Sequence, residues 1–100
     1  MAFSLQVNEA HIKVIFEGNV GIDQARAMWE QLMKAGVPDS VVTVDAGACH
    51  SADFSILQLL WAARALAKVF AVEKSSAAFL GSLDRAGMRR AFRDALRDQP

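Results

Sequence analysis

The sequence predicts an α/β fold, with a mixed four-stranded sheet and helices packed mainly on one of its faces. Short runs rich in β-branched residues alternate with longer segments whose apolar residues recur at helical spacing. The first two strand-like runs adjoin, which favours an antiparallel hairpin, and helices separate the later ones, which favours parallel crossovers. The expected order is β-β-α-β-α-β-α, in a single domain spanning residues 1–100.

The N-terminal third is predicted to form a hairpin followed by a helix. Strands at 3–8 and 10–18 are joined by a tight turn at Asn8-Glu9, and the glycines of "GNVGID" end the second strand. Residues 22–35 have the pattern of an amphipathic helix, which Gly36 terminates. The apolar stripe of this helix consists of Ile22, Ala25, Trp29 and Leu32, with Met28 beside them.

The rest of the chain is predicted as two strands and two helices. "SVVTVDAG" (40–47) is typical of a buried central strand, and a long helix follows from about Asp53 to Ala71. "KSSAAFLG" (74–81) is interpreted as the fourth strand. A last helix, capped by Ser82 or Asp84, carries apolar residues at helical spacing: Leu83, Met88, Phe92 and Leu96.

The balance of charges and the single cysteine limit the kinds of partner and the cellular compartment that we expect. Eleven basic and eleven acidic residues cancel, so no overall field attracts nucleic acid or anionic lipid. The single cysteine, Cys49, cannot form an internal disulfide, which fits a cytoplasmic protein. The start of the chain lacks the pattern of a signal peptide, and the apolar run near 56–72 is interrupted by charges, so no membrane insertion is expected.

One segment, "GACHSADFSILQLLW" (47–61), concentrates side chains capable of chemistry. His50, Ser51 and Asp53 invite a nucleophile–base–acid interpretation, but such groups must converge through tertiary geometry, which local crowding does not supply. A zinc site needs about four convergent ligands, more than the histidines and Cys49 provide. The glycines also do not form a phosphate-binding loop. We therefore expect no enzyme activity, no cofactor and no metal.

The stretch "VVTVDAGACHSADFSILQLL" resembles the signature of STAS domains, the sulfate transporter and anti-sigma factor antagonist family. In that signature a strand ends in an aspartate, and a short loop leads to Asp-Ser-Ser/Thr-Gly-Leu at a helix start. Asp45 matches the strand aspartate, Asp53 the motif aspartate and Leu57 the leucine. "FEGNVG" is similar to the family's Gly-x-Leu-Asp turn, with Gly18 as its glycine.

The resemblance implies a non-enzymatic, cytoplasmic interaction module of bacterial signalling. Many members bind an anti-sigma factor kinase, which inactivates them by phosphorylating a serine beside the motif aspartate. Other members are accessory subunits of chemosensory or ABC lipid-transport assemblies. The implied partner is therefore a kinase-like anti-sigma factor, or else a transporter or chemosensory subunit.

This chain departs from the phosphorylation switch. Phe54 and Ser55 occupy the two serine positions, Ile56 replaces the glycine, and Gly21 replaces the aspartate of the turn. A phenyl ring cannot accept phosphate, so Ser55 is the remaining candidate phosphoacceptor. The alternative is that its hydroxyl only satisfies backbone N–H groups at the helix start.

A helical wheel points to a partner-binding surface. Phe54, Gln58 and Trp61 lie opposite the stripe that should face the sheet, with Leu57 and Arg64 beside them. Exposed aromatic residues and arginines often dominate binding energy. The predicted surface combines the loop at 47–53 with this face, through His50, Ser51, Asp53, Phe54, Leu57, Gln58, Trp61 and Arg64. Two alternatives remain: a neighbouring element such as Phe92 covers Trp61, or the surface serves a homodimer.

Overall fold

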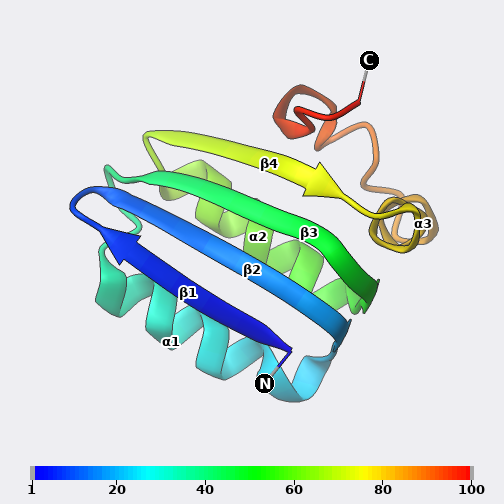
Figure 1. Cartoon of the computed structure of the whole chain (residues 1–100), viewed down its shortest axis with the longest axis horizontal. Coiled ribbons are helices and arrows are strands. Elements are labelled where there is room, and N and C mark those ends of the chain that lie inside the picture. Colours follow the sequence, from blue (N-terminus) through cyan, green and yellow to red (C-terminus); the bar gives the residue numbers. More distant parts are fainter. Residues whose placement is uncertain (1, 100) are drawn as a thin grey trace.

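The computed structural model describes residues 2–99 and contains a mixed four-stranded sheet (Figure 1). The strands are β1 (Phe3–Asn8), β2 (His11–Val20), β3 (Val41–Ala52) and β4 (Val69–Ser75), in that spatial order. β1 is antiparallel to β2, and the two remaining pairs are parallel. The helices are α1 (Ala25–Ala35), α2 (Phe54–Leu66) and α3 (Ala77–Arg85), with 3-10 turns η1 (Ile22–Gln24) and η2 (Arg93–Ala95). The predicted fold class is confirmed.

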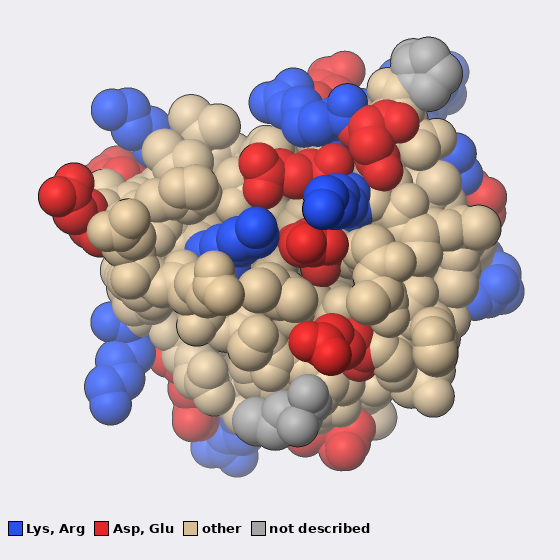
Figure 2. Space-filling view, in the orientation of Figure 1, with Lys and Arg blue, Asp and Glu red and all other residues tan. Residues whose placement is uncertain are grey.

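Two of the helices cover one face of the sheet. α1 and α2 lie side by side behind the strands, whereas α3 packs at one end of β3 (Figure 1). Ile12, Val14 and Phe16 of β2 are fully buried, because they alternate onto the helix-covered face. The opposite face is open, and Figure 2 shows acidic and basic side chains interspersed on it.

The prediction that glycines end the second strand is wrong. β2 passes through Gly18 and continues to Val20, with irregular pairing to β3 between Gly18 and Asn19. Gly18 has φ +67°, a conformation that glycine adopts at little cost, so it allows a bulge without ending the strand.

The helix at 22–35 exists, but its first turn differs from the prediction. Residues 22–24 form the separate turn η1, and this leaves Ile22 71% exposed instead of on the apolar stripe. The buried residues of α1 are Met28 and Leu32. Gly36, with φ +90°, ends the helix as predicted, because its left-handed conformation lets its N–H reach the last carbonyls.

The third strand is longer than predicted, and the expected loop at 47–53 is therefore wrong. β3 continues to Ala52 and pairs with β2 as far as the Val20–Ala52 pair. Asp53 alone separates β3 from α2. The segment "GACHS" has the composition of a loop, but it forms part of β3 because the long β2 offers a partner strand along the whole segment.

The boundaries after α2 also differ from the prediction. The helix expected to reach Ala71 ends at Leu66, and β4 begins at Val69, where Val69–Val72 pair with Val41–Val44. The segment predicted as strand 74–81 is mostly α3. Ser76 caps this helix by accepting the Phe79 N–H at 3.0 Å.

The predicted C-terminal helix is absent from residues 86–99. Gly87, with φ +70°, ends α3, and the chain then runs back along β4. Leu96 forms an isolated parallel bridge with Val72, and Asp98 accepts hydrogen bonds from the Ser75 N–H and hydroxyl at 2.8 and 2.7 Å. Phe92 is fully buried. The segment therefore covers the outer edge of β4. This cover protects the edge strand from pairing with another chain, although residues 86–99 form no α-helix.

Candidate docking surface

The start of α2 is held by a local hydrogen-bond pair. Asp53 Oδ2 accepts the Ser55 N–H at 3.0 Å and the Ser55 hydroxyl at 2.7 Å. The side-chain and backbone hydrogen bonds from Ser55 hold the pKa of Asp53 below its usual value. The carboxylate therefore stays charged at the positive end of the helix dipole, where an anion is favoured. The Ser55 hydroxyl is occupied as a donor to this carboxylate.

A ridge of three side chains, Phe54, Gln58 and Trp61, runs along the outer side of α2. Phe54 is 51% and Trp61 46% exposed, although both are large hydrophobic residues, and Gln58 between them is exposed. The spacing of seven residues corresponds to about two helical turns, or roughly 10 Å along the helix axis. We call this the α2 ridge.

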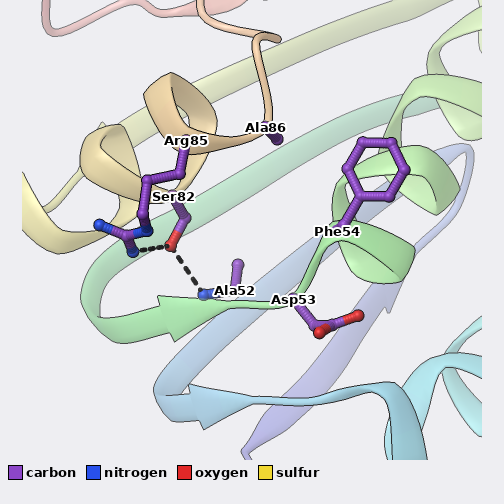
Figure 3. Close-up of a pocket in the computed structure, with 6 residues that line it drawn as sticks. All are labelled: Ala52, Asp53, Phe54, Ser82, Arg85 and Ala86. Carbon is purple, nitrogen blue, oxygen red and sulfur yellow. Dashed lines mark hydrogen bonds between the residues drawn. The ribbon is translucent and has the colours of Figure 1, made fainter.

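A pocket opens beside Phe54, between α2 and α3. It has a volume of about 410 Å³ and is lined by Ala52, Asp53, Phe54, Ser82, Arg85 and Ala86. The Ser82 hydroxyl accepts hydrogen bonds from the Ala52 N–H at 3.1 Å and from Arg85 at 3.3 Å (Figure 3). In Figure 3 Arg85 extends from α3 on one side of the pocket and the Phe54 ring stands at the start of α2 on the other, while the Asp53 carboxylate turns away from Arg85. We call this the α3 pocket.

A second, shallower groove separates α2 from α1. Its volume is about 370 Å³, and its lining residues are Ala25, Arg26, Trp29, Ser55, Gln58, Leu59 and Ala62. Ser55 therefore lies toward α1, whereas Phe54 lies toward α3. The two positions that the family motif gives to serines thus face different grooves.

Trp61 is partly supported by the C-terminal segment. Its ring meets Phe92 edge to face, with centroids 5.8 Å apart and an interplanar angle of 76°. The Arg64 guanidinium lies 5.4 Å from the Trp61 ring centroid and also donates a hydrogen bond to the Ala91 carbonyl. Phe92 therefore covers one edge of the Trp61 ring, as one alternative expected, while about half of the side chain stays exposed.

The other predicted site residues lie in different environments. His50 is exposed near the end of β3, and the Ser51 hydroxyl donates to Asn19 at 2.8 Å. Cys49 is buried, and burial raises the pKa of its thiol.

Leu57 is fully buried, so the expectation that it contributes to the surface is wrong. Its position on the wheel bordered the outer face, but the side chain belongs to the buried hydrophobic core.

The structure adds residues that the sequence analysis did not assign to this surface. Arg85 and Ala86 complete the α3 pocket, and Trp29 and Leu59 line the α1 groove. Among residues 2–99, no group of three or more His, Cys, Asp or Glu side chains is placed to hold a metal ion. Within the same range, no helix has the length and apolar character needed to cross a membrane.

Comparison with known proteins identifies the family of this chain. Residues 1–98 match the sequence model described as "Mlab, STAS domain". The chain belongs to the STAS family. The STAS fold is also found in the crystal structure of an anti-sigma factor antagonist from Mycobacterium paratuberculosis, with a TM-score of 0.74 and 17% sequence identity. That match covers 97% of this chain and 85% of the other. The comparison with curated proteins gives no match.

Proposed function

We propose that this STAS domain is a non-enzymatic interaction module of bacterial cytoplasmic signalling, and that it binds a regulatory partner protein through the α2 ridge. The observation that carries the proposal is the exposure of Phe54 and Trp61 on one side of one helix. Leaving two large aromatic side chains half in water forgoes burial free energy, and a binding partner recovers it. Residues near the start of α2, His50, Ser51 and Asp53, contribute at its margin, and so does Arg64 in the last turn.

The partner we favour is an anti-sigma factor or a related kinase, as the family resemblance implies. The similar fold of an anti-sigma factor antagonist supports this choice. The second candidate is an accessory role in a chemosensory or ABC lipid-transport assembly. It is favoured by the description of the matched family model, which is that of a Mlab STAS domain rather than an antagonist.

We further propose that the usual phosphoserine switch is altered. Phe54 removes one of the two acceptor positions, and the Ser55 hydroxyl is committed to Asp53. A kinase would have to break this hydrogen bond before it could modify Ser55. We therefore propose that phosphorylation of this position is not the main control of binding.

The test is capture of a partner by the full chain from extract of the native cell, compared among variants. Trp61→Ala should weaken binding by about 2 kcal/mol, roughly 30-fold in Kd, because an aromatic anchor is lost. Val7→Ala is the matched control, since Val7 is 53% exposed on β1, at the far edge of the sheet. Equal capture by both variants, with both folded, would reject the α2 ridge as the docking surface.

The identity of the captured protein separates the two candidate settings. An anti-sigma factor or kinase supports the first, and a transporter ATPase or chemosensory protein supports the second. Light scattering of the purified chain accompanies the test, because a homodimer formed through the same ridge would compete with partner binding and would dissociate in the Trp61→Ala variant.

A further inference from the structure

The charge of this neutral chain is unevenly distributed. Residues 85–97 contain five arginines and a single acidic residue, Asp94, although the whole chain has a net charge of zero. The arginines are Arg85, Arg89, Arg90, Arg93 and Arg97. Among residues 2–99, only Arg89 of these five has a carboxylate within 4.0 Å, that of Asp84 at 3.0 Å. The segment therefore carries positive charge that the described chain does not neutralise.

This basic segment borders the α2 ridge along its length. At one end, Arg85 and Ala86 share the α3 pocket with Phe54. At the other end, the Ala91 carbonyl accepts a hydrogen bond from Arg64, and Phe92 contacts Trp61. Arg90, which is exposed, belongs to the stretch between these two contacts. The Arg85 side chain and the Phe54 ring thus line one pocket, and Arg90 belongs to the chain that connects this pocket with the Trp61 contact.

Two acidic groups near the α3 pocket, Asp53 and Asp84, are already engaged. Asp53 accepts two hydrogen bonds from Ser55 and turns away from Arg85 (Figure 3). Asp84 pairs with Arg89. The Arg85 guanidinium donates to the Ser82 hydroxyl, a neutral acceptor, and keeps its remaining donors. A carboxylate brought by a partner would meet a guanidinium that can bind it with two parallel hydrogen bonds.

We propose that the α3 pocket and its arginines select an acidic partner segment, in which a large apolar side chain packs against Phe54 and flanking carboxylates pair with Arg85 and Arg90. This inference rests on the proposed function and adds the chemistry of the partner. The pocket volume of about 410 Å³ suits one large side chain and its neighbours rather than a whole folded element. Charge complementarity of this kind mainly sets specificity and association rate.

The experiment uses random peptides displayed on phage and selected against the full chain at low salt. Selected peptides are then synthesised, and their Kd is measured. The expected peptides combine Asp or Glu with Leu, Phe or Trp. The double variant R85E/R90E should weaken their binding roughly tenfold, and high salt should shrink the difference, because screening acts on exposed charge pairs.

The matched control is the double variant K13E/K34E, which makes the same change in net charge away from α2. Lys34 is exposed in the last turn of α1, and Lys13 lies on β2 on the open side of the sheet. Measured at about 0.15 M salt, where the screening length is about 8 Å, binding by this variant should stay within about twofold of the unchanged chain, because exposed charges farther away than that act weakly. A loss equal to that of R85E/R90E would show a general charge effect and would overturn the inference.

Four further outcomes count against the inference. Selection of neutral or basic peptides overturns it, and so does a failure to select any peptide. Binding to phosphatidylglycerol vesicles or to polyuridylate that depends on Arg85 and Arg90, in place of peptide binding, also overturns it. Peptides that require Trp61 but not the two arginines would leave the proposed function intact and remove only the charge requirement.

Discussion

Trp61 of α2 and Phe92 of the C-terminal segment meet edge to face, with ring centroids 5.8 Å apart. Phe92 is fully buried and also lies 6.2 Å from the Phe70 ring of β4. One side chain thus joins the sheet, the C-terminal segment and the exposed tryptophan. The orientation of the α2 ridge therefore depends on a residue more than thirty positions away in the sequence.

Replacing Phe92 should loosen this support. Phe92→Ala is expected to lower the free energy of unfolding by about 3–5 kcal/mol, because it leaves a cavity among buried aromatic rings. Denaturant unfolding measures the loss, and tryptophan emission at low denaturant should shift to longer wavelength as Trp61 gains water. Phe92→Leu, which keeps most of the volume, serves as the control. An unchanged midpoint for the alanine variant would mean that the C-terminal segment is not packed as described.

Leu57 should behave as a core residue in spite of its place beside the α2 ridge. Leu57→Ala is expected to cost about 2–5 kcal/mol of stability, because a fully buried aliphatic side chain is removed. Gln58→Ala, at the next and exposed position, should change stability by about 0.5 kcal/mol or less. Thermal unfolding of both variants checks the difference, and equal melting temperatures would contradict the burial of Leu57.

The Asp53–Ser55 pair predicts a specific pH dependence. Because the hydrogen bonds from Ser55 lower the pKa of Asp53 in the folded chain, this carboxylate stabilises the fold above its unfolded pKa. That contribution is lost as the pH falls through the folded pKa. Carboxyl titration by NMR should show an Asp53 pKa below the usual value, and Ser55→Ala should raise it. An identical pKa in both chains would rule out the Ser55 contacts as its cause.

Cys49 should react slowly with thiol reagents in the folded protein. Burial raises the pKa of its thiol, with a smaller opposing contribution from the Ser51 carbonyl contact, so little thiolate forms at neutral pH. Labelling with a disulfide-exchange reagent should be complete within the mixing time in denaturant and much slower without it. Equally rapid labelling in both conditions would show that the end of β3 opens readily.

Strand alternation and helical spacing were sufficient to predict the order of elements. Ile12, Val14 and Phe16 alternate because one face of β2 is covered and the other is open. The end of α2 could not be predicted, because "ARALAKVFAV" contains no glycine or proline. Ala67 leaves the helical conformation where Val69–Val72 find the edge of β3, and that pairing is a tertiary effect.

The candidate surface was also predictable only in part, because tertiary contacts determine its margins. The exposure of Phe54 and Trp61 follows from their positions on one helix, which a wheel captures. Arg85 and Trp29 reach the margins of α2 from α3 and α1, and no local pattern links them to it. Gly87 falls within the helix predicted for the C-terminal residues, but its positive φ ends α3, and the arginine-rich segment then runs back along β4 and contacts α2.

The most direct test of the α2 ridge is site-specific crosslinking in the native cell. A photoreactive p-benzoylphenylalanine at position 58, between Phe54 and Trp61, should form an adduct with one other protein, and Trp61→Ala should abolish that adduct. The same probe at Gln6, exposed on β1, should form none. No adduct at position 58, or the same adducts from both positions, would contradict the account.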